Sequence, residues 1–233
     1  MPIFWEIVAG SLAGFFVSPI NTIVDKSVIE NANGKIPLWQ GVGKGFKNLF
    51  LQPHVFMKSF EFKWILFVYT TTYASSNIAD HMEISGVDPA IIKLTVSFLV
   101  NTVASLMKDK AFTQTFGTQK IKSFPMTSYA FLLSRDIVGM ASAFTIPPII
   151  GRYLSKKFNL NEKDGLRAGQ LISPLIIQFI ATPLHLFGLD YYNRENLAFM
   201  KRMQYIGSIY WNTVLLRMMR FLPAYGLGGI ANI

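Results

Sequence analysis

The sequence has no cysteine and very few motifs that carry chemistry. Without cysteine it can form no disulfide and can offer no thiolate as a nucleophile or metal ligand. Its three histidines, His54, His81 and His185, do not have a metal-binding spacing. The sequence also has no carboxylate pair, nucleophile motif or phosphate-binding loop. We therefore expect no enzyme activity, no catalytic residue and no bound metal.

Charged residues are also scarce. Asp, Glu, Lys and Arg make up only 15% of the 233 residues, whereas a soluble domain has about 25%. Hydrophobic residues make up 51%, and several apolar runs reach the roughly 17–25 residues that cross a bilayer. The six expected spans are about 4–24, 54–76, 90–107, 127–153, 166–189 and 206 onward. A soluble helical core is the alternative, but it does not explain so little charge, so an all-α membrane protein is predicted.

The formal net charge of +9 comes from basic residues in short segments between the apolar runs. This distribution favours contact with membrane lipids and gives no dense basic face for nucleic acid, so we expect no nucleic-acid partner. The segments after the first, third and fifth spans are net positive. By the positive-inside rule, both termini then lie on the opposite side of the membrane. Charged residues assigned to these segments include Lys26, Lys108, Asp109, Asp190 and Arg202.

The sequence also shows internal repetition, which indicates how its helices are organised. The first and fifth spans each contain a proline, Pro19 and Pro183, and a proline is tolerated in a lipid-embedded helix when a neighbouring helix re-satisfies the freed carbonyl. In the even spans Pro53, Val138 and Pro223 follow one another at intervals of 85 residues. We therefore predict a single domain, 1–233, built from three two-helix repeats at about 1–82, 83–162 and 163–233.

These features resemble the mitochondrial carrier family. Met219-Arg-Phe-Leu-Pro223 is similar to that family's arginine-x-x-proline motif at the start of even helices, and Arg135-Asp-Ile-Val is similar again. The resemblance implies a six-transmembrane-helix pseudo-threefold bundle with short matrix-side helices. It also implies a multi-pass protein of the mitochondrial inner membrane with termini facing the intermembrane space.

The chain departs from the family at its charged gate motifs. Each odd helix of a carrier has opposite charges after its proline, whereas the matching positions here are neutral. These degenerate gate positions are Pro19, Asn21, Val24, Asn101, Pro183, His185 and Gly188. The loss predicts a non-transporting structural accessory subunit of a respiratory-chain complex, with other subunits as partners. The alternative is an unorthodox transporter of a small anionic metabolite.

Charged side chains inside the expected spans are candidates for a cavity that holds an anionic solute. They are Lys58, Glu61, Lys63, Arg135, Asp136, Arg217 and Arg220. The alternative is that they extend to headgroups or pair locally, as Lys58 and Glu61 can at i,i+3. His185 either is a polar group of this cavity or forms a hydrogen bond to a neighbouring helix.

Lipid contacts are the only cofactor interaction expected. Trp39, Gly41 and Trp211 lie near basic residues and resemble the places where carriers hold cardiolipin. Cardiolipin or another anionic phospholipid is therefore expected at these three positions.

Overall fold

The computed structural model describes residues 3–117 and 123–220, and 85% of these residues are helical. The chain divides into two compact units, residues 1–122 and 123–233. Four helical segments are long and apolar enough to cross a membrane: Phe4–Ala32, Pro89–Phe116, Met126–Phe158 and Glu162–Asn193. The predicted all-α class is confirmed, and these four segments are candidate membrane spans. The six-helix pseudo-threefold arrangement is not confirmed, and the three repeats stay a prediction.

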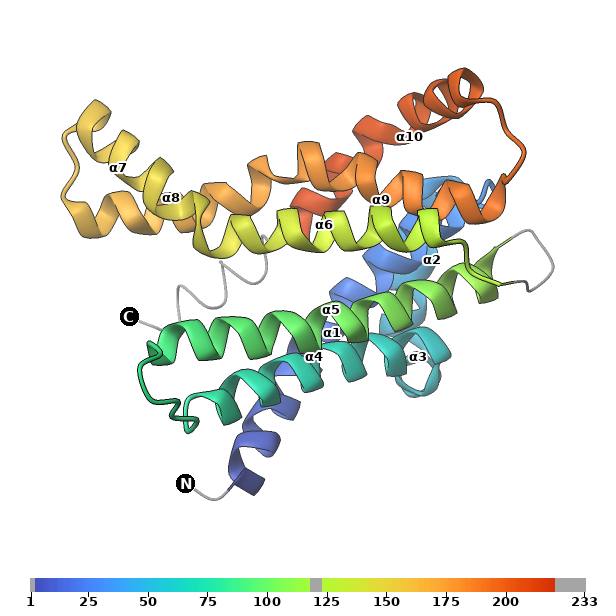
Figure 1. Ribbon diagram of the computed structural model, residues 1–233. Helices are drawn as coiled ribbons and strands as arrows, with labels where there is room; N and C mark the ends of the chain where they lie inside the picture. Colours follow the sequence, from blue (N-terminus) through green and yellow to red (C-terminus); the bar gives the residue numbers. More distant parts are fainter. Residues whose placement is uncertain (1–2, 118–122, 221–233) are drawn as a thin grey trace. The chain divides into compact units, whose positions relative to one another are not determined.

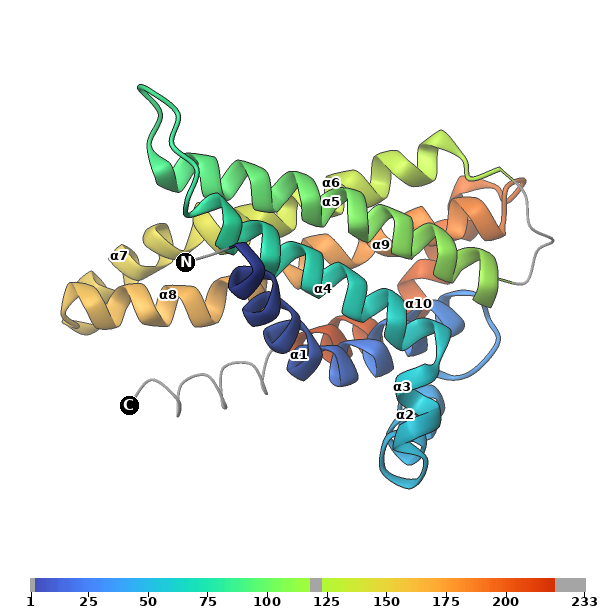
Figure 2. The same ribbon diagram turned by 90° about the horizontal axis from the view of Figure 1, so that it is seen from below.

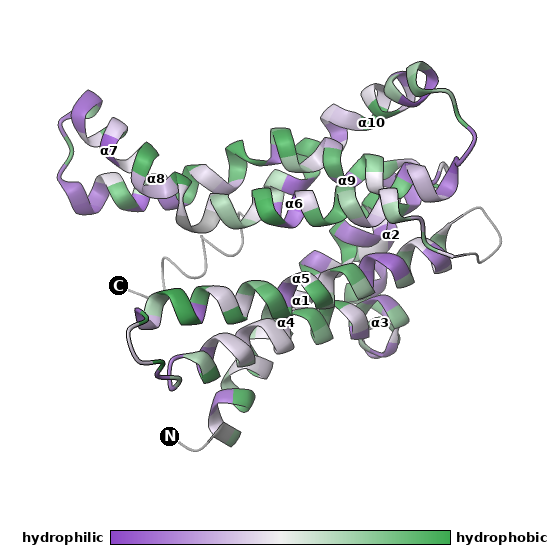
Figure 3. Cartoon of the chain, in the orientation of Figure 1, coloured by the Kyte–Doolittle hydropathy of each residue, from purple (hydrophilic) through white to green (hydrophobic). Residues whose placement is uncertain are grey.

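The first unit contains five helices among its described residues: α1 (Ile3–Ala32), α2 (Leu38–Leu51), α3 (Pro53–Lys58), α4 (Phe60–Ala79) and α5 (Pro89–Phe116). The long helix α1 packs antiparallel against α4, and α5 packs on the other side of α4 (Figures 1 and 2). The short helix α2 packs on the second half of α1. Apolar residues dominate the first half of α5, as expected for a segment in lipid (Figure 3).

Two glycines allow the backbones of α1 and α4 to approach closely. A Cβ on Gly10 would lie 2.6 Å from the backbone nitrogen of Ala74, and a Cβ on Gly14 would lie 2.9 Å from that of Thr70. In lipid, helices associate through such close backbone approach because apolar surface alone gives no net attraction. The Gly10-x-x-x-Gly14 pair therefore sets where α1 crosses α4.

Helix α1 continues through Pro19 for its whole length of 30 residues. Polar side chains near the proline bond carbonyls one turn earlier in the same helix. Ser18 Oγ donates to the Gly14 carbonyl at 2.6 Å, and Asn21 Nδ2 donates to the Val17 carbonyl at 2.9 Å. These bonds satisfy the side chains inside the helix, where no water is available.

The second unit is described from residue 123 to residue 220. It contains α6 (Met126–Phe144), α7 (Ile146–Phe158), α8 (Glu162–Ile176), α9 (Gln178–Asn193) and α10 (Phe199–Met219). Helix α6 packs on α9, α7 packs on α8, and α10 packs on α9 (Figure 1). The expected sixth span corresponds to α10 only in part, because residues 221–233, including Pro223, lie outside the described residues.

Both apolar segments of this unit are interrupted. The first changes from α6 to α7 at Thr145, just before Pro147 and Pro148, which have no N–H to donate to the preceding turn. The second changes from α8 to α9 at Ile177, three residues after Pro174. Pro183 lies inside α9 and frees the Phe179 carbonyl. That carbonyl accepts a hydrogen bond of 3.0 Å from Tyr210 Oη of α10, as expected for a proline in a membrane helix.

Glycines also join the α7–α8 hairpin. A Cβ on Gly151 would lie 2.8 Å from the Gly165 carbonyl oxygen, and a Cβ on Gly169 would overlap the Pro147 carbonyl. Asn159 ends α7 in the left-handed conformation, with φ of 53°, which turns the chain toward α8. The turn itself is hydrophilic (Figure 3).

Several charges that the sequence placed in loops lie in helices. Helix α1 extends to Ala32, α5 to Phe116 and α9 to Asn193, so Lys26, Lys108 and Asp190 are helical residues. The loop charges on which the predicted orientation depended are therefore fewer than expected. The orientation of the termini is not supported.

The glycine contact gives the first prediction. We expect Gly10→Ala to lower the free energy of unfolding by about 1–3 kcal/mol, because its Cβ would push the α4 backbone away. The matched control is Gly43→Ala, since a Cβ on Gly43 in α2 meets nothing within 4 Å. This control should raise stability by up to about 1 kcal/mol through helix propensity. Tryptophan-fluorescence melting in detergent measures both, and equal melting temperatures would contradict the proposed role of Gly10.

Candidate functional site

Each unit encloses charged side chains between its helices. In the first unit, Lys108 of α5 lies between two carboxylates. Its Nζ is 2.6 Å from Asp25 Oδ2 of α1 and 2.7 Å from Asp109 Oδ1 of α5. All three residues are at most 8% exposed. Since removing a charge from water is costly, such residues are retained only when they are paired and hydrogen-bonded. The group joins α1 to α5.

A second ion pair in this unit joins α1 to α4. Lys26 bonds Glu61, and its Nζ also lies 5.2 Å from the centre of the Phe116 ring of α5. Glu61 therefore pairs with Lys26 and not with Lys58, the local partner that we considered as an alternative. Lys58 is exposed at the end of α3, and Ser59 separates this helix from α4. Lys63 is likewise exposed, on the first turns of α4.

The second unit holds a carboxylate between two guanidinium groups. Asp190 of α9 bonds Arg194 Nη1 at 2.6 Å and also bonds Arg202 of α10. Arg202 Nη2 donates to the Arg194 carbonyl at 2.8 Å, and its guanidinium lies 3.9 Å from the centre of the Tyr191 ring. Asp190 and Arg202 are 2% and 1% exposed, so this group is inside the protein and ties the end of α9 to the start of α10.

Two residues singled out from the sequence, His185 and Arg217, meet in the second unit. Arg217 Nε of α10 donates to Gln178 Oε1 of α9 at 2.9 Å, and Arg217 Nη1 bonds His185 Nδ1. Because a guanidinium can only donate, His185 Nδ1 accepts this hydrogen bond, and the proton of the neutral imidazole is on Nε2. Gln178, Thr182 and His185 are spaced four and three residues apart, so they share one face of α9. All four residues are at most 5% exposed.

The other expected gate positions mainly make local contacts. Asn21 bonds its own helix, and Asn101 Oδ1 of α5 accepts a 3.2 Å bond from Thr72 Oγ1 of α4. A Cβ on Gly188 would lie 2.8 Å from Leu132 Cγ of α6, so this glycine permits close helix packing. Val24 is buried and Pro19 is partly buried. A role of these positions as a gate stays a prediction.

The remaining candidates are spread over the surface or paired with neighbours. Arg135 Nε donates to Asp136 Oδ1 at 2.9 Å, which matches the local pairing that we considered. Arg220 caps the end of α10. Trp39 and Trp211 are exposed, and Gly41 packs against Ser27 of α1, where its Cβ would lie 3.1 Å from Oγ. Lipid contact at these three positions is untested.

Sequence reasoning missed Asp25, Lys108, Asp109, Asp190 and Arg202. It ended the first, third and fifth spans at their first charge, although the helices continue beyond it, and it placed Arg202 in the segment before the sixth span. Val24, Val28 and Ala32 keep a helical spacing across Asp25, and Phe112 lies one turn after Lys108. That continuation was the available signal for buried charges inside long helices.

Comparison with known proteins gives one match. The family model described as "Probable citrulline exporter" matches residues 9–233. No curated protein and no solved structure matches. The resemblance to the mitochondrial carrier family is therefore wrong, because the model that matches nearly the whole chain is that of another family. The mitochondrial inner membrane, the respiratory chain and cardiolipin have no support, whereas a transmembrane protein with a transport function does.

The buried group around Asp190 gives a second prediction. We expect Asp190→Asn to lower the free energy of unfolding by about 3–5 kcal/mol, because it leaves two guanidinium groups facing a neutral amide inside the protein. The control is Asp80→Asn, which breaks the half-exposed pair with Lys93 and should cost at most about 1 kcal/mol. Thermal melting in detergent compares the two variants. A loss for Asp190→Asn no larger than for the control would show that the buried pair does not hold α9 to α10.

Proposed function

This chain belongs to the family of probable citrulline exporters, and we propose that it is a multi-pass membrane transporter that exports a small, neutral, zwitterionic amino acid of the citrulline type. The single observation that carries the proposal is the family match over residues 9–233, which takes in nine of the ten described helices entirely and α1 from residue 9. The four apolar helical segments are consistent with it, since a transporter must cross the bilayer.

The transporter hypothesis replaces the accessory subunit as the favoured function. We predicted an accessory subunit because neutral residues occupy the carrier gate positions, and that comparison was made with the wrong family. The transported solute also changes, from the small anion that we expected to a zwitterion. Partnership with other subunits remains an untested expectation.

We place the substrate contacts in the second unit, on Arg217 and Gln178. A guanidinium recognises a carboxylate through paired N–H donors, and every amino acid has a carboxylate. The side chain of citrulline ends in a neutral ureido group, which resembles the amide of Gln178 in its donors and acceptor. His185, the partner of Arg217, lies in the apolar segment Glu162–Asn193, and ionisable residues inside such segments commonly mark the path of a solute. His185 orients the guanidinium from the same face of α9.

Alternating access requires contacts that hold one state and break in another. We assign this role in the first unit to the Lys26–Glu61 pair and to the group of Asp25, Lys108 and Asp109. Each joins two helices that are separate in sequence, so separation of the helices would break it. Sequence analysis did not identify these ion pairs, because it looked for charges at the carrier gate positions, and those positions are neutral here.

Transport is tested with the purified full chain in proteoliposomes. We expect labelled citrulline to exchange across the membrane faster than in empty vesicles, and unlabelled citrulline to compete better than a small dicarboxylate. Arg217→Gln should lower the rate about 10–100-fold, as expected for a lost hydrogen bond to a charged group. Arg152→Gln, which changes an exposed arginine of α7, should leave the rate unchanged. Vesicles that take up no more citrulline than empty ones would refute the proposed function.

A further inference from the structure

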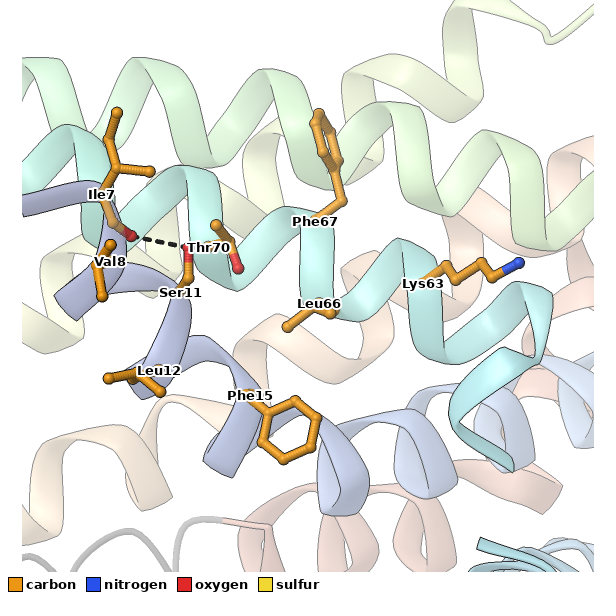
Figure 4. Close-up of a pocket in the computed structure, with 9 residues that line it drawn as sticks. All are labelled: Ile7, Val8, Ser11, Leu12, Phe15, Lys63, Leu66, Phe67 and Thr70. Carbon is orange, nitrogen blue, oxygen red and sulfur yellow. Dashed lines mark hydrogen bonds between the residues drawn. The ribbon is translucent and has the colours of Figure 1, made fainter. Parts of the chain in front are cut away.

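The first unit has an apolar groove between α1 and α4 that no part of the proposed transport mechanism uses. Its volume is about 650 Å³. Ile7, Leu12 and Phe15 line it from α1, and Leu66 and Phe67 line it from α4 (Figure 4). Four of these five side chains, all except Leu66, are more than 40% exposed in the groove and its mouth. The volume lies within the range of about 300–1,000 Å³ typical of sites for small ligands.

The groove has almost no polar lining along its length. The hydroxyl of Ser11 donates to the Ile7 carbonyl of its own helix at 2.7 Å, so it is already satisfied (Figure 4). Along this apolar stretch the charged groups of a zwitterionic amino acid would therefore find no ionic partner. A hydrocarbon chain, which needs no hydrogen bonds, suits this lining.

One end of the groove is marked by a cation. Lys63 lines that end, and its side chain extends away from the apolar residues (Figure 4). It is exposed, and none of the ion pairs found in the described residues includes it. An exposed lysine at the boundary of an apolar groove is placed to bind an anionic headgroup.

The length of the groove fits one lipid. Thr70 lies opposite Gly14, and Ile7 and Lys63 are each seven residues from this crossing, in opposite directions along the antiparallel pair. At about 1.5 Å per residue, the groove is about 21 Å long. Half of a hydrocarbon core of about 30 Å is about 15 Å. One acyl chain with its glycerol and phosphate is therefore long enough to reach from the far end of the groove to Lys63.

We propose that the groove holds an acyl chain of an anionic phospholipid whose headgroup phosphate contacts Lys63. The site differs from Trp39, Gly41 and Trp211, where the sequence led us to expect lipid. It depends only on the membrane location of the first unit and not on the transported solute. The lipid would fill the space beside the Gly10–Gly14 crossing.

Native mass spectrometry of the full chain tests this site, with a mixture of phosphatidylglycerol and phosphatidylcholine as the probe. We expect the wild-type chain to retain phosphatidylglycerol in preference to phosphatidylcholine. Lys63→Gln should lower phosphatidylglycerol retention roughly fivefold, the size expected for one basic residue near an anionic surface, with little change for phosphatidylcholine. Ser11→Phe should lower retention of both lipids because its ring would occupy the groove.

Two variants serve as matched controls. Lys93→Gln removes a half-exposed lysine of α5 that pairs with Asp80, and Ala13→Phe adds a ring on an exposed position of α1 that does not line the groove. Neither should change lipid retention. The proposal is overturned if Lys63→Gln retains as much phosphatidylglycerol as the Lys93→Gln control. It is also overturned if Ser11→Phe and Ala13→Phe retain equal amounts of both lipids.

Discussion

The fold depends on how closely helix backbones can approach one another in lipid. Apolar side chains gain little there by leaving one apolar environment for another, so contact between backbones has to supply the attraction. Glycines make this contact at the α1–α4 crossing through Gly10 and Gly14, and at the α7–α8 hairpin through Gly151 and Gly169. The buried charges lie at other helix contacts, between α1 and α5 and between α9 and α10.

The buried charges tie together both distant and consecutive helices. Lys108 connects α5 to α1, and Asp190 connects α9 to α10. Such pairs add little net stability compared with apolar packing, but removing one partner is strongly destabilising. Their value for a transporter is that they are specific and breakable.

Composition and hydropathy were sufficient to predict an all-α protein with helices long and apolar enough to cross a membrane, whereas a role of Arg217 and His185 as cavity or gate residues stays a prediction. Helix ends were not predictable in the same way, because a charge ends an apolar run in sequence but not in a helix that buries it. Asp25 and Lys108 were missed for this reason. The family was also wrong, since repeated prolines and a few arginine motifs are compatible with more than one family of helical membrane proteins. The hydrogen bond between Arg217 and Gln178 could not be predicted from the sequence, because 39 residues separate them and only the packing of α10 on α9 brings them together.

The interruptions at Thr145 and Ile177 have a mechanical consequence. Both lie at the same end of the α7–α8 hairpin, whose two helices are held together by backbone contacts at Gly151, Gly165 and Gly169. A tightly joined pair that is connected to the rest of its unit by two adjacent helix breaks can tilt as a rigid body while its internal packing stays intact. Thr145 and Ile177 can therefore act as two hinges at one end of the hairpin, and the hydrophilic turn at its other end would move furthest.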